Sequence, residues 1–293
     1  NNISEIYGID HVDSFINSNK YRHYKFDLSN NNLESIPEKL FDVDLLIHTA
    51  GIPSPQYYKI EPFKTITLNY DVTKSLLKKI NNNTTFIYFS SSEIYGNPDP
   101  ANIPTKETYN GYVSSVGDRS CYDESKRLGE TICYLFKNDK NKKVKIIRPF
   151  NYYGDYMKQN DNRIIPKFMS QAMNDQNITV FGHGKQTRAY CNIDDAVGMI
   201  KNICLKGKHF VYNVGKMDEE ITAIKLAERV LKTIPNSKSK LIQIDYPNEY
   251  PKDEPMRRCP NIDKYYEEFN QKPSIGIDEG LYKFYQYAKK NWL

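Results

Sequence analysis

The chain has 293 residues, which is enough for one large α/β domain or for two smaller lobes with a real hydrophobic core. Hydrophobic residues make up 39% and charged residues 26%, a balance that is typical of a globular protein and excludes a disordered one. The formal net charge of +5 suits a site for a small anion, but the chain has no basic blocks, so we expect no nucleic-acid partner.

The cellular setting is indicated by what the sequence lacks. No apolar run is long enough to span a membrane and the first residues show no signal-peptide pattern, so we expect no membrane partner. The five cysteines are scattered without a Cys-x-x-Cys pair, which argues against a disulfide framework or a zinc site and favours a reducing cytoplasm. The five histidines form no ligand pair, so we expect no metal.

The chain is predicted to open with two strands that end in acids. Residues 6–10 read as a short buried strand ending in Asp10, and residues 24–28 as a second strand ending in Asp27. Asp10 can serve as the carboxylate that ends the second strand of a dinucleotide fold, which binds both ribose hydroxyls of NAD and repels the 2′-phosphate of NADP. At Asp10 the residues alone favour an ordinary cap or turn acid.

The next segments are predicted as strand, helix and strand. Residues 43–49 are almost wholly apolar and run into Ala50 and Gly51, whose small size would let a ligand approach the backbone closely. A helix with an apolar stripe is predicted over 61–80, and a buried strand over 85–89.

Strands thus alternate with helices, and the strands are apolar on both faces. This pattern predicts an α/β fold: a Rossmann-like, doubly wound parallel sheet covered by helices on both sides. Ligands bind such sheets beyond the carboxyl ends of the strands. The residues that we predict at those ends are Asp10, Asp27, Thr49 and Ser90 to Glu93.

A helix predicted over 122–137 carries Tyr122 and Lys126. Four residues apart, the two side chains share one face of a helix and can point into one cleft. A nearby ammonium favours the phenolate and lowers the pKa of a tyrosine, which would make Tyr122 a usable base near neutral pH. Taken alone, this spacing is common, and an ordinary surface pair is the simpler explanation.

The second half of the chain has more aromatic residues and loops, as a substrate lobe would. Further strands are predicted over 144–150, 178–181 and 241–244, and further helices over 163–173, 193–203, 222–233 and 278–290. We therefore predict a dinucleotide-binding domain over 1–150 and a mainly substrate-binding lobe over 151–293, with about 187–215 returning to the first domain.

Two loops in this half are rich in cations. The loop over 182–188 is bracketed by glycines and suits a phosphate about as well as a solvated hairpin tip. The loop over 249–260 contains Arg257 and Arg258 among prolines and acids.

Three motifs together resemble one family, the extended short-chain dehydrogenases/reductases, over nearly the whole chain. They are Ser-Ser-Ser-Glu-Ile-Tyr-Gly at 90–96, Tyr122-x-x-x-Lys126, and Arg-Pro-Phe-Asn-Tyr-Tyr-Gly at 148–154. The family comprises NAD-dependent nucleotide-sugar epimerases, dehydratases and decarboxylases. Segments 117–124, 186–190 and 257–262 resemble most closely its UDP-glucuronate decarboxylase branch.

The resemblance implies a role for each matching residue. Tyr122 would be the catalytic base and acid, and Lys126 would lower its pKa and bind the nicotinamide ribose. Catalytic roles at the sugar would fall to Ser91, Ser92, Glu93 and Arg258. The nucleotide diphosphate and the substrate would be held by Asn151, Arg188, Tyr190 and Arg258. NAD would be bound by Asp10, Asp27, Leu28, Thr49, Ala50, Gly51, Asn69, Ser90, Tyr122, Lys126 and Pro149.

Arg258 is the residue on which the branch depends most. The resemblance places it near the sugar carboxylate, which a planar guanidinium fork suits geometrically. The residues alone weigh this role equally with that of a surface arginine in a charged loop.

The sequence departs from the family at two places. The family's first strand and its Gly-x-x-Gly-x-x-Gly turn, which bring backbone N–H groups to the pyrophosphate, have no match, and the first strand here corresponds to the family's second. We expect those residues to precede Asn1 in the full protein. Ser91 replaces a threonine found in many relatives, and either hydroxyl can make the hydrogen bond.

The predicted function is decarboxylation of UDP-glucuronate to UDP-xylose through a transient 4-keto sugar. A 4,6-dehydratase would need an acid where this chain has Ser92, and a 4-epimerase usually has no glutamate at position 93. Both stay open, as does a non-catalytic nucleotide-binding sensor of the same fold, although the intact Tyr122 and Lys126 argue against it. The resemblance also implies a homodimer built on a four-helix bundle.

Overall fold

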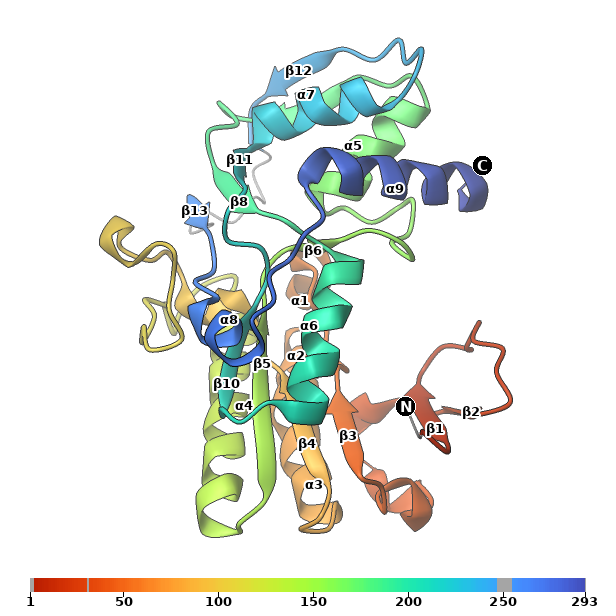
Figure 1. Ribbon diagram of the computed structural model, residues 1–293, viewed down its shortest axis with the longest axis vertical. Coiled ribbons are helices and arrows are strands. Elements are labelled where there is room, and N and C mark those ends of the chain that lie inside the picture. Colours follow the sequence, from red (N-terminus) through yellow and green to blue (C-terminus); the bar gives the residue numbers. More distant parts are fainter. Residues whose placement is uncertain (1–2, 31, 247–254, 293) are drawn as a thin grey trace. The chain divides into compact units, whose positions relative to one another are not determined.

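The structure is a computed structural model that describes residues 3–30, 32–246 and 255–292. The chain divides into two compact units, residues 1–90 with 119–146 and residues 91–118 with 147–293. Figure 1 follows the chain through both units by colour. The predicted functional boundary at residue 150 stays a prediction; by compactness, the segment 91–118 belongs with the later part of the chain.

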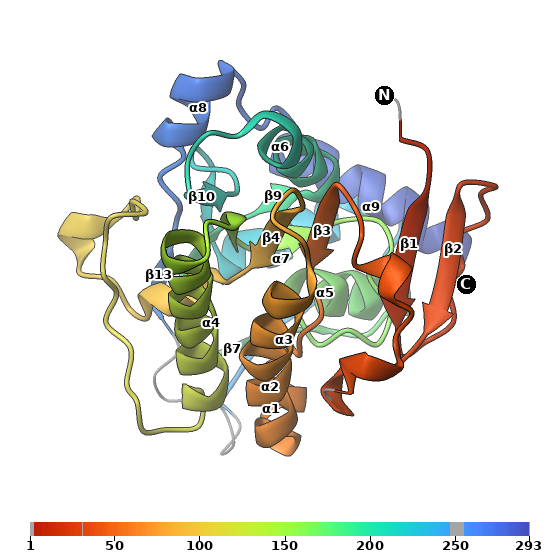
Figure 2. The same ribbon diagram turned by 90° about the horizontal axis from the view of Figure 1, so that it is seen from below.

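The first unit contains two pairs of parallel strands, which Figure 2 shows from below. β1 (Ile6–Asp10) pairs with β2 (Tyr21–Lys25), and β3 (Leu45–His48) pairs with β4 (Thr85–Phe89). β5 (Lys143–Pro149) begins in this unit as the neighbour of β4. The interior of β4 is buried as expected, whereas β1 is half-exposed and is not the buried strand that we predicted.

The second strand was predicted at 24–28, and this placement is wrong. β2 spans Tyr21–Lys25 because its five residues pair one by one with the five residues of β1. Beyond the strand, the Asp27 carboxylate accepts hydrogen bonds from the backbone N–H and the hydroxyl of Ser29, at 2.9 and 2.6 Å. These bonds belong to a turn that overlaps the 3₁₀ helix over Leu28–Asn30. The extended backbone therefore ends before Asp27.

The helix predicted over 61–80 is two helices, α2 (Pro62–Asn69) and α3 (Asp71–Lys79). The break lies at Tyr70, and there the Asn69 carbonyl accepts hydrogen bonds from the Thr73 hydroxyl at 2.8 Å and the Tyr88 phenol at 3.3 Å. Side chains thus satisfy a carbonyl at the end of a helix. A short helix that the apolar pattern did not indicate, α1 (Pro55–Ile60), precedes them.

The long helix α4 (Ser120–Asp139) contains the predicted 122–137 helix and packs against α2 and α3. Gly129 allows its close approach to β4. A Cβ at Gly129 would lie 2.1 Å from the Tyr88 phenol oxygen and 2.8 Å from the Asn69 carbonyl oxygen, so any larger residue would push the helix outwards. The buried face of α4 includes Tyr122, Ser125 and Lys126.

The second unit is a set of small sheets and helices. Its strands pair as β6 (Tyr152–Tyr153) with β9 (Cys191–Asn192), β7 (Ile178–Phe181) with β12 (Leu241–Ile244), and β8 (Thr187–Ala189) with both β11 (Glu220–Thr222) and β13 (Arg257–Arg258). Its helices are α5 (Ile164–Met173), α6 (Ile193–Lys206), α7 (Ala223–Thr233), α8 (Asp263–Phe269) and α9 (Ile277–Asn291). β10 (Val211–Val214) lies beside the end of β5, and neither β10 nor α8 was predicted.

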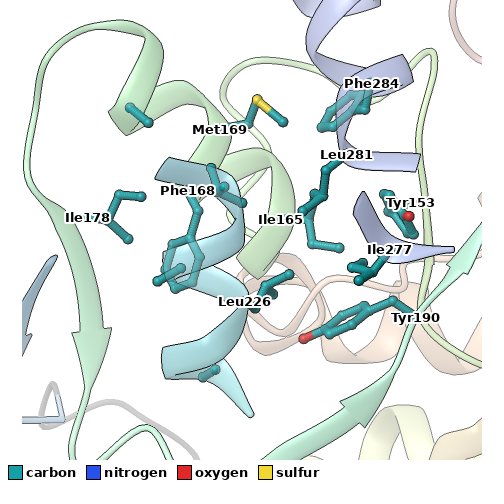
Figure 3. Close-up of a cluster of buried hydrophobic side chains, with 14 of the residues drawn as sticks. Tyr153, Ile165, Phe168, Met169, Ile178, Tyr190, Leu226, Ile277, Leu281 and Phe284 are labelled. Carbon is teal, nitrogen blue, oxygen red and sulfur yellow. The ribbon is translucent and has the colours of Figure 1, made fainter. Parts of the chain in front are cut away.

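The core of this unit lies where α5, α7 and α9 meet (Figure 3). Apolar side chains recur every three or four residues along each helix, so one face of each is buried in the same cluster. Figure 3 labels Ile165, Phe168, Leu226, Leu281 and Phe284 within it, and all five are 2% exposed or less.

The described residues lack two further features. No helix among them combines the length and the apolar character needed to cross a bilayer. They also contain no group of three His, Cys, Asp or Glu side chains that could hold a metal ion.

Candidate active site

The first unit brings Tyr122 and Lys126 together on the buried face of α4. The Lys126 amine lies 5.9 Å from the centre of the Tyr122 ring and donates a hydrogen bond to the Phe89 carbonyl, at 2.7 Å, at the end of β4. Both side chains are 5% exposed. The spacing of four residues therefore does place the phenol and the amine side by side, as the sequence predicts.

Burial determines the charge of this lysine. Burial lowers the pKa of Lys126 to about 7, and the smaller attraction to Glu130 and Cys133 opposes this effect. Burial, with the charge of Lys126, also lowers the pKa of His48 to about 3, so His48 is neutral. Without a bound anion, the amine is thus balanced near neutral pH between its charged and uncharged forms.

Replacing Lys126 by methionine tests this balance. In the unfolded chain the amine keeps a proton up to its ordinary pKa of 10.5, but in the folded protein only up to about 7. Between these values the unfolded state binds more protons, so the stability contributed by Lys126 rises with pH. The quantity of interest is the free energy of unfolding of the parent protein minus that of Lys126→Met. We expect this difference to increase by at least about 1 kcal/mol from roughly pH 7 to pH 10.

Urea denaturation without NAD at several pH values measures this difference. The control is Lys78→Met, which changes an exposed lysine of α3. A difference between parent and Lys126→Met that stays flat over the range would contradict the burial of an uncharged amine.

Around Lys126 the structure shows a small polar cradle. A Cβ on Gly51 would lie 3.3 Å from the Asn69 side-chain oxygen and 3.5 Å from the Lys126 amine, so any side chain at Gly51 would fill it. The Asn69 amide nitrogen donates to the Ser125 hydroxyl at 2.9 Å. The Asn69 amide oxygen and the Ser90 hydroxyl are buried yet have no hydrogen-bond partner in the described chain.

Buried polar atoms without partners cost free energy, so a ligand with hydroxyl or amide groups fits this place. Four of the residues predicted to bind NAD carry these features, namely Gly51, Asn69, Ser90 and Lys126, and their contact with NAD stays a prediction. Thr49 and Ala50 follow β3 directly. Three more predicted contacts lie at other strand ends: Asp10 is the exposed last residue of β1, Leu28 follows Asp27 beyond β2, and Pro149 ends β5. Their contact with a cofactor stays a prediction.

Sequence reasoning missed a residue that packs on Tyr122, the predicted base. The ring of Tyr58, from α1, stacks on that of Tyr122 with centres 5.2 Å apart and planes 15° from parallel. Stacked aromatic rings restrict each other's orientation. No local pattern marks Tyr58, because its role arises only when α1 meets α4.

The second unit brings Glu93 and Arg258 together. Glu93 lies in a 3₁₀ turn (Ser92–Tyr95), and the hydroxyl of Ser91 accepts a hydrogen bond from its backbone N–H at 3.2 Å. Its carboxylate forms an ion pair of 2.7 Å with Arg258, and both side chains are largely buried. Ser91 and Ser92, which directly precede Glu93 in the chain, are buried as well. The alternative of a surface arginine at Arg258 is therefore wrong.

The register of two strands places Arg258 directly opposite Arg188. β13 runs parallel to β8, and Arg258 pairs with Arg188 while Arg257 pairs with Thr187. Like charges opposite each other on neighbouring strands repel, so this arrangement is stabilised by anions. Glu93 supplies one negative charge to Arg258. Arg188 itself is buried and donates to the carbonyls of Thr187 and Met256.

Two other predicted substrate residues lie next to Ala189, the last residue of β8. Asn151 adopts a left-handed backbone conformation and donates to the Ala189 carbonyl at 3.3 Å. Tyr190 is buried in the hydrophobic cluster of this unit, with its ring edge-on to that of Tyr153. Their contact with substrate stays a prediction. The first half of the loop over 249–260, namely 249–254, lies outside the described residues.

Comparisons with known proteins identify the family. Residues 1–215 match the NAD dependent epimerase/dehydratase family, and the chain belongs to it. The NAD dependence in the family's description agrees with the predicted cofactor. UDP-glucuronic acid decarboxylase 4 of Arabidopsis thaliana is 36% identical over 92% of this chain and 60% of its own length. UDP-glucuronic acid decarboxylase 1 of Danio rerio is 33% identical over 95% of this chain and 66% of its own.

Solved structures show the same fold. UDP-glucose 4-epimerase of Thermotoga maritima has a TM-score of 0.85 at 19% identity, covering 99% of this chain and 92% of its own. UDP-glucuronic acid 4-epimerase of Bacillus cereus, with UDP-glucuronic acid and NAD, has a TM-score of 0.78 at 24% identity, covering 98% and 91%. The predicted Rossmann-like α/β fold is confirmed. The chain spans less than two thirds of the length of the two decarboxylases named above.

Proposed function

We propose that the protein is an NAD-dependent nucleotide-sugar decarboxylase, a lyase that converts UDP-glucuronate to UDP-xylose through a transient 4-keto sugar. The names of its relatives support this reading. The observation that carries it is the placement of Arg258 opposite Arg188, with Glu93 paired to Arg258. Two arginines at paired positions of neighbouring strands suit a substrate with two anionic parts, a diphosphate and a carboxylate.

The first chemical role belongs to Tyr122. Its phenolate takes the proton from the sugar 4-hydroxyl, and Lys126 favours that phenolate when it carries its charge. Gly51, Asn69, Ser90 and Lys126 would hold the NAD. Bound there, NAD would supply the hydride acceptor for C4 and, once reduced, the hydride donor that restores the alcohol.

Oxidation at C4 makes the C6 carboxylate a β-keto acid. The bond between C5 and C6 then breaks, CO₂ leaves with C6, and its electron pair remains as an enolate on the ring. The hydroxyls of Ser91 and Ser92 can donate hydrogen bonds to the developing charge. A proton added at C5, on the side assigned to Glu93, and a proton returned by Tyr122 to the 4-oxygen complete the pentose.

Product analysis tests this function. The full-length protein, supplied with NAD and UDP-glucuronate, is expected to release CO₂ and form UDP-xylose, followed by mass spectrometry and NMR. UDP-galacturonate as the product would instead establish a 4-epimerase. Turnover of an uncharged nucleotide hexose to its 4-keto-6-deoxy form would establish a 4,6-dehydratase. No turnover of any nucleotide sugar, together with no bound NAD, would favour a sensor.

We further propose a homodimer in the cytoplasm, with α2 and α4 of two copies forming a four-helix bundle. Its support is apolar surface on these packed helices: Phe63 is 83% exposed, Leu128 42% and Leu135 43%. Burying such side chains is favourable by about 1.5–3 kcal/mol each. All five cysteines are free thiols, as a reducing compartment would keep them.

Replacing Leu128 and Leu135 together by glutamate is expected to shift the protein from dimer to monomer in analytical ultracentrifugation. A matched control is Val197→Glu, which changes a comparably exposed apolar residue of α6. A dimer that persists in the double variant would place the interface elsewhere.

A further inference from the structure

A buried amide on β10, that of Asn213, joins three separate segments of the second unit. Its oxygen accepts a hydrogen bond from the Tyr95 phenol at 2.7 Å. Its nitrogen donates to the carbonyls of Thr105 and Asn261, at 2.8 and 3.0 Å. The side chain is fully buried, so all three bonds are shielded from water.

Two of these segments carry the ion pair described above. Tyr95 is two residues after Glu93, and Asn261 is three residues after Arg258. Thr105 binds the same stretch through its backbone: its N–H donates to the Cys259 carbonyl, and its carbonyl accepts from the Asn261 N–H, both at 2.9 Å. The amide of Asn213 thus holds the two flanks of the pair at a set separation.

Arg148 fixes the direction of this amide. Its guanidinium is buried and donates to the Tyr95 phenol oxygen at 2.7 Å and to the Glu107 carbonyl at 2.9 Å. Because the phenol oxygen accepts a hydrogen bond from Arg148, its own O–H is directed to the Asn213 amide oxygen, to which it donates. The Glu107 carboxylate accepts from the Asn213 backbone N–H at 2.9 Å, which holds β10 to the same network.

We propose that Asn213 is a positioning residue for recognition of the sugar carboxylate, acting through the separation of Glu93 and Arg258. The inference rests on the proposed function, since it assigns the pair to a carboxylated sugar. Removing the amide takes one hydrogen bond each from the Tyr95 phenol and from the carbonyls of Thr105 and Asn261, and the two flanks are then held less firmly. A shift of the order of 1 Å is enough to weaken a directed charge pair.

The test compares three ligands in the NAD-loaded full-length protein by calorimetry: UDP, UDP-glucose and UDP-glucuronate. For Asn213→Ala we expect the Kd of UDP-glucuronate to rise about tenfold or more, while the Kd of UDP changes less than about twofold. The preference for UDP-glucuronate over UDP-glucose falls by the same factor. A purely structural role would weaken all three ligands together.

A softer variant and a control accompany this measurement. Tyr95→Phe keeps the ring and removes one bond of the amide, so the same preference should fall about three- to tenfold. The control is Asn202→Ala, which removes another side-chain amide of this unit. That amide donates hydrogen bonds to Tyr265 and Gln271, at 2.8 Å each, and its loss should leave the preference unchanged.

The possible outcomes distinguish a failure of this inference from a failure of the proposed function on which it rests. If the parent protein itself binds UDP-glucose as tightly as UDP-glucuronate, the proposed function is wrong and the inference falls with it. If the parent discriminates and Asn213→Ala keeps the full preference, or loses affinity for all three ligands equally, only the inference is overturned. Should Asn213→Ala fail to fold, an unchanged preference in Tyr95→Phe overturns it.

Discussion

Replacement of Tyr122 by phenylalanine is expected to lower kcat for UDP-glucuronate by about 10²–10⁴-fold, because the 4-hydroxyl loses the base that takes its proton. The ring that stacks on Tyr58 is retained, so the buried face of α4 keeps its packing. Binding of NAD and UDP-glucuronate should change less than about threefold, since the lost interaction is made in the transition state. Release of CO₂ measures the rate, and calorimetry measures the binding.

The matched control is Tyr134→Phe, which removes a phenol oxygen from an exposed position on the same helix. It should keep the full rate. If Tyr122→Phe retained more than about a tenth of kcat, the base would have to be another group, and the role given to the Tyr122–Lys126 pair would be wrong.

Replacement of Arg258 by glutamine is expected to lower kcat/KM for UDP-glucuronate by about 10²–10³-fold. Truncating one partner of a buried charge pair leaves the other uncompensated and costs about 2–5 kcal/mol. Here the uncompensated group is Glu93, which is 2.7 Å from Arg258 and 16% exposed. The substrate carboxylate loses its cation in the same step. Steady-state release of CO₂ gives the loss.

Two further variants show whether the loss is specific. Arg257→Gln removes the neighbouring arginine, which pairs with Glu220 and is 43% exposed, and should cost less than about fivefold. In the double variant Glu93→Gln with Arg258→Gln, the losses should not add, because the two groups act as one pair. A loss in Arg258→Gln that affects UDP as strongly as UDP-glucuronate would assign Arg258 to the diphosphate instead.

The local elements followed from the sequence wherever one periodicity dominated. β4, β7 and β12 lie where the apolar runs predict them, and α4 extends the predicted helix by two residues at each end. The helix over 61–80 was wrong because its apolar stripe continues across Tyr70, where the backbone breaks. The second strand was misplaced because polar residues at 21–25 pair with β1, although their own pattern is weak.

The candidate site divides in the same way. Tyr122 and Lys126 could be paired from spacing alone, since one turn of one helix carries both. Arg188 and Arg258 could not, because they are seventy residues apart and meet only through the register of β8 and β13. Tyr58 and Asn213 carry no local signal, and their roles arise from partners on other elements.

The sequence by itself determined the family, the alternation of strands and helices, and the tyrosine with its lysine. The family follows from the resemblance of its motifs, and the other two depend on neighbours within a few residues, where backbone geometry decides which side chains share a face. Only the tertiary structure decided that Lys126 is buried enough to lose its charge near neutral pH, that Glu93 pairs with Arg258, and that an amide on β10 joins their flanks. Those facts depend on burial and on contacts between distant segments, which arise when the chain excludes water from its interior.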